Sequence, residues 1–362
     1  MDHAIPPCRQ RLHGLDALRA GALLLGIVLH ASMSFIPADQ FWVVRDDQPS
    51  DAIAMLFFVI HIFRMTTFFV IAGLFARMSF HRLGARGFLG DRLRRIALPF
   101  SVAWLVIIPL TWPVSYWAMG HSYGPEIYHT AMAAPPRFSP RMIPLQHLWF
   151  LYVLAIFYAV VVLASGCMNR IDPNFRLGLQ VHRAARRVLR PPFAILVLAA
   201  PATLALASVD GWTMWWGVPA SDRGLIPLPA TLIAYGAAFA SGWAMHRHID
   251  LLAAWKRWWW ASLALALALT LVCLACAGSE PRHAFAAQGA AKLAEAGVYA
   301  ITGWAWTFAL LGVSLRFFSR FSRIRRYLAE ASYWMYLVHM PLIVVLQAGV
   351  SHMPWGLSLI HI

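Results

Sequence analysis

The sequence predicts an all-α protein, a polytopic bundle of transmembrane helices with a cytoplasmic N-terminus. Hydrophobic residues make up 60% of the 362 residues and charged residues only 12%, about half the charged share of a typical soluble domain. Long apolar segments alternate with short basic ones along the whole chain. Because no internal repeat, soluble domain or low-complexity linker interrupts this pattern, we expect a single membrane domain over residues 1–362.

Nine apolar segments approach or exceed the roughly 20 residues that a membrane-spanning helix needs. The fifth segment is short and the third contains Pro109 and Pro113, so their boundaries are fixed only to within a few residues. The segments cover residues 15–37, 52–76, 96–117, 145–166, 192–208, 227–246, 258–278, 296–315 and 331–350.

Positive charge is distributed unevenly between the connecting segments. Most of the 30 Lys and Arg residues lie in one alternating set of connections, which includes the N-terminal segment. Because cytoplasmic loops carry the excess of Lys and Arg, this bias predicts a cytoplasmic N-terminus. The same bias explains the net charge of +15 without a nucleic acid partner.

Three ionisable residues, Asp16, Arg19 and His30, share one face of the first apolar segment at 100° per residue. An ionisable group in hydrocarbon is costly unless it faces a partner or a water-filled cavity. Asp16 lies about 21 Å from His30 along a helix, so we expect it to pair with Arg19 near the cytoplasmic end. His30 is then expected in the outer half of the membrane.

Further ionisable side chains lie inside the second, fourth and ninth segments. His61 and Arg64 share a face at i, i+3, His147 opens the fourth segment beside Trp149, and His339 lies at mid-depth. A single buried histidine is commonly a satisfied core residue, but several at similar depth favour a site. Since Arg64 stays charged and few carboxylates lie in the spans, we expect a polar cavity or a bound anion there.

A basic cluster of Arg92, Arg94 and Arg95 stands at the start of the third segment, in RGFLGDRLRRIALPF. Arginine clusters bind phosphates well. The positive-inside rule by itself also supplies such a cluster, so composition leaves both interpretations open.

The four cysteines do not indicate a disulfide framework. Cys273 and Cys276 form a C-x-x-C pair, but inside an apolar run without partner histidines. Core packing explains this pair, and we expect no metal site.

Five stretches of the chain, in this order, resemble the acyltransferase-3 family of integral-membrane acyltransferases. They are LDALRAGALLLGIVLH, FFVIAGLF, RLRRIALPF, HLWFL and SYWMYLVHMP. Each is mostly apolar with one or two polar residues, but together they cover most of the chain. The longer stretches LDALRAGALLLGIVLHAS, HIFRMTTFFVIAGLF and HLWFLYVL are most similar to the branch that succinylates periplasmic glucans.

The resemblance implies transfer of a succinyl or acetyl group from cytoplasmic acyl-coenzyme A to a hydroxyl of a periplasmic or cell-envelope glycan. The enzyme would work in a bacterial inner membrane, with acyl-coenzyme A as a co-substrate rather than a permanently bound cofactor. The family has about ten spans, so we expect that a last transmembrane helix is missing from residues 1–362.

The resemblance also implies roles for individual residues. His30 matches the first-helix histidine of the family and is the expected general base. Arg64 is expected to bind the distal carboxylate of a succinyl group or to stabilise the oxyanion of the tetrahedral intermediate. The other candidates are His61 and His339 as further catalytic residues, His147 and Trp149 for acceptor binding, and Arg19, Arg92, Arg94 and Arg95 for the coenzyme phosphates.

A multi-pass transporter of an anionic or proton-coupled solute is the alternative. Buried His and Arg residues also build proton relays and anion paths. Many transporters carry an internal repeat, however, and this sequence shows none. Consumption of acyl-coenzyme A by the purified protein would distinguish the two classes, because a transporter moves its solute without consuming it.

Overall fold

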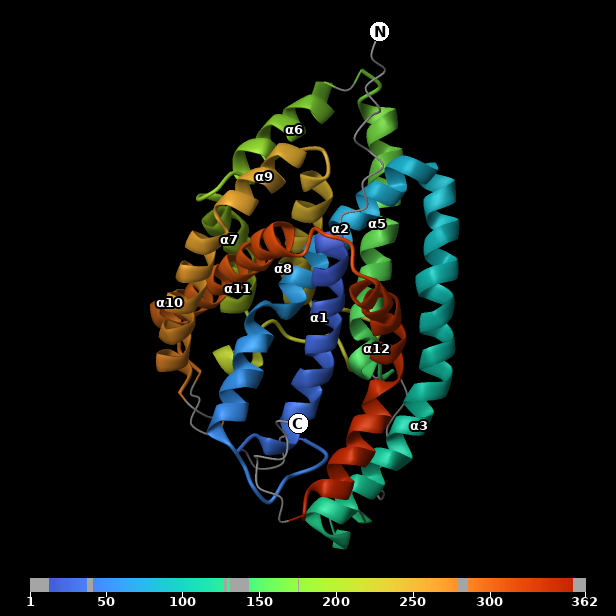
Figure 1. Ribbon diagram of the computed structural model, residues 1–362, viewed down its shortest axis with the longest axis vertical. Helices are drawn as coiled ribbons and strands as arrows, with labels where there is room; N and C mark the ends of the chain where they lie inside the picture. Colours follow the sequence, from blue (N-terminus) through green and yellow to red (C-terminus); the bar gives the residue numbers. More distant parts are fainter. Residues whose placement is uncertain are drawn as a thin grey trace.

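The computed structural model describes residues 13–37, 42–126, 129–130, 143–174, 176–278, 281 and 286–353. Within these ranges the chain is helical and contains no strand (Figure 1), which confirms the predicted all-α class. The helices are α1 (His13–Ser32), α2 (Asp51–Arg92), α3 (Leu98–Tyr123), α5 (Trp149–Ile171), α6 (Arg176–Val188), α7 (Ala194–Ala207), α8 (Pro229–Met245), α9 (Ile249–Arg257), α10 (Trp259–Ala277), α11 (Gly289–Phe317) and α12 (Arg323–Val350), with short turns η2 (Met33–Phe35), η3 (Leu93–Ala97), η4 (Gln146–Leu148) and η5 (Met214–Trp216).

A helix stands at each of the nine predicted segments, and six helical stretches in the described residues are long and apolar enough to cross a membrane. One of these stretches, Asp51–Tyr123, contains two predicted segments, because α2 continues through η3 into α3. The chain changes direction near Gly84, whose φ of 66° is outside the helical region. The fifth and sixth segments correspond to α7 and α8, which are shorter, at 14 and 17 residues.

The centre of the bundle is the packing of α2 against α8. A Cβ on Gly73 would meet the carbonyl of Phe239, and a Cβ on Gly242 would meet the carbonyl of Val70. Facing glycines let two helix backbones approach closely, which is how helices in membranes commonly gain packing energy. The central position of α2 matters because this helix carries His61 and Arg64.

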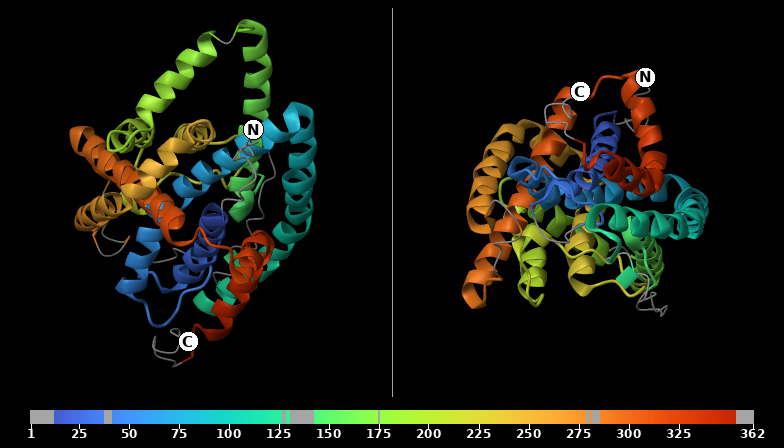
Figure 2. Two further views of the ribbon diagram at one scale, coloured as in Figure 1. Left: turned by 45° about the horizontal axis from the view of Figure 1, so that its top comes forward. Right: turned by 90° about the horizontal axis from the view of Figure 1, so that it is seen from below.

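Helix α1 contacts α2, α11 and α12, whereas α3 runs along the outside of the bundle beside α12 (Figures 1 and 2). The arginine-rich helix α6, the helix α9 with Lys256 and Arg257, and the connection from α2 to α3 gather at one end of the molecule, at the top of Figure 1. The loop between η2 and α2 and the end of α3 lie at the other end. This arrangement agrees with the alternation of charge, and the cytoplasmic side of the arginine-rich end stays a prediction.

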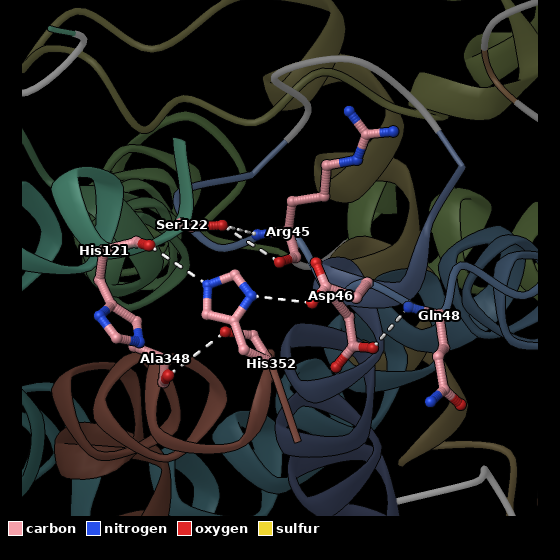
Figure 3. Close-up of polar contacts among 9 residues, drawn as sticks. Arg45, Asp46, Gln48, His121, Ser122, Ala348 and His352 are labelled. Carbon is pink, nitrogen blue, oxygen red and sulfur yellow. Dashed lines mark hydrogen bonds and ion pairs between the residues drawn. The ribbon is translucent and has the colours of Figure 1, made fainter. Parts of the chain in front are cut away.

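Polar contacts tie the loop between η2 and α2 to the ends of α3 and α12 (Figure 3). The Nδ1 of His352 lies 2.9 Å from the Asp47 carboxylate, and its Nε2 lies 3.2 Å from the carbonyl oxygen of His121. The Oγ of Ser122 accepts from the backbone N–H of Arg45 at 2.7 Å. Both ring nitrogens of His352 thus face oxygen atoms. The hydrogen bond to the Asp47 carboxylate favours the protonated ring and so raises the pKa of His352 above its usual value.

Candidate functional site

Three helical elements bring His30, His147 and His339 together, and we call these residues the histidine cluster. The Nδ1 of His30, on α1, lies 2.8 Å from the Nε2 of His339, on α12. The ring of His339 also lies 5.0 Å, centre to centre, from the ring of His147, on η4. The structure thus places three of the predicted site residues in one contact group.

The hydrogen bonds of the cluster assign the ring protons of His339 and His30. The Nδ1 of His339 lies 2.5 Å from the carbonyl oxygen of Tyr336, which can only accept a hydrogen bond, so Nδ1 carries the proton. In a neutral ring the Nε2 of His339 is then an acceptor, and the Nδ1–H of His30 donates to it. A neutral His30 therefore keeps its lone pair on Nε2.

His147 is held through both its ring and its backbone oxygen, while one ring nitrogen lacks a hydrogen-bond partner among the described residues. Its Nε2 donates to the carbonyl oxygen of Leu337 at 3.1 Å, and the hydroxyl of Tyr336 donates to its backbone oxygen. The side chain is only 5% exposed, and its Nδ1 has no hydrogen-bond partner among the described residues. An orphaned nitrogen in a buried side chain suits a bound polar molecule.

The guanidinium of Arg64 lies against α1 at Gly26, where a Cβ would contact its Nη1 and approach its Cζ to 3.5 Å. Gly26 stands four residues before His30, so both lie on the same face of α1. The Nε of Arg64 is buried and has no hydrogen-bond partner within the described part of the chain. The absence of a side chain at Gly26 thus brings a cation to the face of α1 that carries His30.

A cavity of about 770 Å³ joins these residues to the end of the molecule that holds the loop between η2 and α2. Its inner wall includes His30, His61, Arg64 and His147. Its remaining lining combines aromatic rings with polar groups, among them Trp42, Trp149, Trp216, Tyr235, Ser115, Gln146, Ser221 and Asp222.

Arg64 stands at a boundary between cavities. It also lines a second, mostly apolar cavity of about 340 Å³, which lies between α1, α2, α11 and α12. A small space of about 30 Å³ beside His30 and Trp149 adjoins both cavities, since Arg64 lines it as well. Arg64 therefore lies on the wall of all three spaces.

Asp222, in the loop between α7 and α8, is the acidic residue on the wall of the large cavity. Burial raises the pKa of its carboxyl above the usual value. The backbone oxygen of Asp222 accepts from the N–H groups of Leu145 and Gln146, at 2.7 Å and 3.0 Å, next to His147. This loop thereby closes over η4.

The remaining predicted residues lie apart from the histidine cluster. His61 lines the large cavity, but its Nδ1 lies 3.3 Å from the carbonyl oxygen of Trp215. The predicted pair of Arg19 with Asp16 is present, with 3.6 Å between Nη2 and Oδ1. The guanidinium of Arg19 also lies 5.3 Å above the ring of Phe75.

The basic cluster at η3 lines none of the cavities described above. The Nη2 of Arg92 donates to Ser79 at 2.7 Å, and the Nε of Arg95 pairs with Asp91 at 2.8 Å. Arg94 is exposed. These arginines are thus separated from the histidine cluster, and their predicted role at the coenzyme phosphates stays a prediction.

Two residues beside His30 were missed by the sequence reasoning. The Nε2 of Gln347 donates to the backbone oxygens of His30 and Ala31, at 3.1 Å and 3.0 Å, and its Oε1 accepts from Trp42 at 2.9 Å. The ring of Trp42 stacks on His30 with 6.4 Å between centres. The available signal was a glutamine within an apolar run, Gln347, which lies about two helical turns after His339 on the same helix.

The C-x-x-C pair does not contribute to this site. Cys273 is buried and lies 3.4 Å from the hydroxyl of Thr302, while Cys276 is exposed. Among the described residues, no group of three or more His, Cys, Asp or Glu is arranged to hold a metal ion.

Comparison with known proteins supports the resemblance. The profile of the acyltransferase-3 family, described as an acyltransferase domain, matches residues 12–360. Glucans biosynthesis protein C of Escherichia coli (strain SMS-3-5 / SECEC) and of Shigella dysenteriae serotype 1 (strain Sd197) are each 30% identical over 158 residues. That alignment covers 43% of this chain and 40% of each relative.

No solved structure matches this chain. The family profile, in contrast, covers almost all of it, and the long apolar helices make it a multi-pass membrane protein. The chain therefore belongs to the acyltransferase-3 family.

Proposed function

We propose that this protein is a transmembrane O-acyltransferase of a bacterial inner membrane. It moves an acyl group from cytoplasmic acyl-coenzyme A to a hydroxyl of a periplasmic or cell-envelope glycan. The observation that carries this proposal is the meeting of His30, His147 and Arg64 at the inner end of a large cavity. A base and a fixed cation at one buried point are what acyl transfer to a hydroxyl requires.

The lining of the large cavity supports a carbohydrate acceptor. Its volume of about 770 Å³ falls in the range typical of ligand sites. The indole rings of Trp42, Trp149 and Trp216 offer flat apolar faces for sugar rings, and the neighbouring polar side chains can bind hydroxyls. The curated relatives are named for glucan biosynthesis, so a periplasmic glucan is the acceptor we propose.

In the proposed reaction the Nε2 of His30 takes the proton of the acceptor hydroxyl as its oxygen attacks the thioester carbonyl carbon. The tetrahedral intermediate then collapses, the carbon–sulfur bond breaks, and an ester forms. The departing thiolate takes up the proton held by His30, which leaves free coenzyme A and the neutral base. Each turnover is therefore balanced without a metal ion or a redox partner.

His339 acts through His30 in this scheme and is a positioning residue. It accepts the Nδ1–H of His30 and is itself held by the carbonyl of Tyr336. This arrangement directs the lone pair of His30 to the other ring nitrogen, as a carboxylate does in many histidine sites. His61, with His147 and Trp149 on the same cavity wall, is proposed to position the acceptor.

Arg64 has two possible roles in the reaction, and both use an anion. It either binds the distal carboxylate of a succinyl group or stabilises the oxyanion of the tetrahedral intermediate. The buried Nε without a partner among the described residues supports an anion at this position. Similarity to the glucan-succinylating branch favours the first role.

The experiment that tests the proposal replaces His30 by Ala and measures acylation. The purified protein is reconstituted with succinyl- or acetyl-coenzyme A on one side and a periplasmic glucan on the other, and the glucan is analysed by mass spectrometry. We expect the parent to consume acyl-coenzyme A only with glucan present, and His30→Ala to lose about 100-fold or more of this rate, the usual contribution of a general base.

Two results would contradict the proposal. Near-parental acylation by His30→Ala at equal protein abundance would show that His30 is not the base. Movement of solute across the bilayer without consumption of acyl-coenzyme A would instead favour the transporter.

A further inference from the structure

The second cavity has the shape of a groove that follows α1. It is lined by seven residues of α1 between Ala17 and Leu25, a stretch that spans about 12 Å at the helical rise. The opposite wall comes from α11 and the beginning of α12, and includes Val313 and Leu328. We call this space the donor groove.

Each end of the donor groove carries an arginine. Arg64 lines one end, where the groove adjoins the histidine cluster. Arg325, at the start of α12, lines the other end. The wall between them is mostly apolar, so the groove suits a slender ligand that carries anionic or polar groups at its two ends.

The outer end of the groove is basic beyond Arg325 itself. Ala17 and Arg325 also line a small adjoining space with three further basic residues, His13, Arg320 and Arg326, and with Asp16, which pairs with Arg19. The guanidinium of Arg325 is held by the carbonyl oxygens of Phe318 and Arg320, at 3.0 Å and 2.7 Å. These contacts fix its direction while its positive charge remains available for a phosphate.

We propose that acyl-coenzyme A binds with its phosphates at Arg320, Arg325 and Arg326 and its acyl-pantetheine arm in the donor groove. The thioester then reaches Arg64 and His30 from the start of α12, while the acceptor reaches them from the large cavity. The inference rests on the proposed function and assigns its donor site to α1, α11 and α12 rather than to η3.

The positive charges at the two ends of the donor groove favour acyl-coenzyme A over a membrane lipid as its occupant. A phospholipid could place its phosphate at Arg325, but its acyl chain would then end beside the buried guanidinium of Arg64. Hydrocarbon against a buried cation is unfavourable, because the charge loses its solvation without gaining a partner. A thioester or a succinyl carboxylate offers Arg64 an acceptor instead.

Gly21 provides a direct test, because it lines the groove and a Cβ there would meet nothing within 4 Å. Gly21→Leu should fill the groove without displacing protein atoms. Gly166→Leu, on the exposed surface of α5, is the matched control, since a Cβ there also meets nothing within 4 Å. Arg325→Gln independently tests the outer end of the groove, and Arg170→Gln, at an exposed position, is its control.

Binding of coenzyme A and of succinyl-coenzyme A is measured by calorimetry on the full-length protein in lipid nanodiscs. We expect Gly21→Leu and Arg325→Gln each to raise the Kd about tenfold or more, as loss of space or of a charged hydrogen bond predicts. The two controls should stay within about twofold of the parent. Gly21→Leu should weaken the acylated donor at least as much as free coenzyme A.

Other outcomes separate failure of this inference from failure of the proposed function. Parental affinity in both Gly21→Leu and Arg325→Gln overturns the donor groove and leaves the acyltransferase proposal standing. The same conclusion follows if coenzyme binding is weakened in Arg94→Gln or Arg95→Gln but not in the groove variants. No binding of either coenzyme by the parent overturns both. A phospholipid retained by the parent in native mass spectrometry, lost from Gly21→Leu and not displaced by coenzyme, assigns the groove to lipid.

Discussion

At the scale of single residues, the proposed site uses one histidine, His339, to orient another, His30. Many histidine bases are oriented by a carboxylate, but here the acceptor for His30 is the neutral ring of His339. A neutral acceptor needs no buried negative charge in the membrane, where such a charge is costly. The proton on Nδ1 of His339 is in turn fixed by the carbonyl of Tyr336.

The orienting role of His339 is tested by two substitutions. His339→Leu removes the acceptor, and we expect kcat to fall about 100-fold, since a misoriented base contributes little. In His339→Gln the amide oxygen can occupy the place of Nε2, and it should restore much of kcat. The KM for the donor should be near the parental value in both, as measured by steady-state kinetics of glucan acylation. Equal losses of kcat in the two variants would contradict an orienting role.

The two roles proposed for Arg64 make different predictions for two donors. Arg64→Ala should reduce succinyl transfer at least tenfold more than acetyl transfer if the guanidinium binds the distal carboxylate, because only the succinyl group has one. The rates of succinyl and acetyl transfer are measured side by side, by mass spectrometry of the product at equal protein abundance. Equal losses would assign Arg64 to the oxyanion instead.

At the scale of elements, α1 brings the parts of the site together. Gly26 admits Arg64 from α2, His30 meets His339 of α12, and Gln347 binds the backbone at the end of α1. Farther out, the contacts of His352 attach the loop between η2 and α2 to the ends of α3 and α12 (Figure 3). This loop carries Trp42, so the contacts of His352 also bear on the wall of the large cavity.

The attachment by His352 should depend on pH. The hydrogen bond to Asp47 raises the pKa of His352 in the folded protein, so its stabilisation is complete below about pH 6.5, the unfolded value. It is lost as the pH rises through the folded value. The protection factors of the amides of residues 43–50, which are exchange rates corrected for the intrinsic pH dependence, should therefore be higher at pH 6 than at pH 8.5. The difference should be small because the pair is partly exposed.

The control for this pH effect is His352→Gln, in which the difference in protection factor between the two pH values should largely disappear. His121 and Asp46 also lie near His352 and remain in that variant. If the protection factors of His352→Gln keep the parental pH dependence, the effect comes from these neighbours or from another part of the fold.

At the scale of the whole molecule, adjoining cavities lead through the bundle. The space at Arg325, the donor groove, the small space beside His30 and the large cavity share lining residues in sequence. Arg64 lines the last three of these spaces. In the proposed reaction, a donor from one side and an acceptor from the other meet at α1 without either molecule crossing the bundle.

The positions of the helices follow from the sequence, because each depends on a local property. About 20 apolar residues form a helix in a membrane wherever they occur, since every backbone hydrogen bond must be made internally. All nine predicted segments coincide with helices for this reason. The pairing of Asp16 with Arg19 was equally local. The continuity of α2 with α3 was not foreseen, because it depends on how the chain turns near Gly84.

The sequence by itself determined the fold class, the family and the ionisable residues at membrane depth. The tertiary structure alone decided which of those residues meet. His30 and His339 are 309 positions apart and touch, whereas His61 and Arg64 share a helix face but have different neighbours. Hydropathy fixes where a helix lies along the chain, but the faces that meet depend on the packing of all helices together. Only the folded chain therefore shows that Arg64 packs against Gly26 and that Arg325 lines one end of the donor groove.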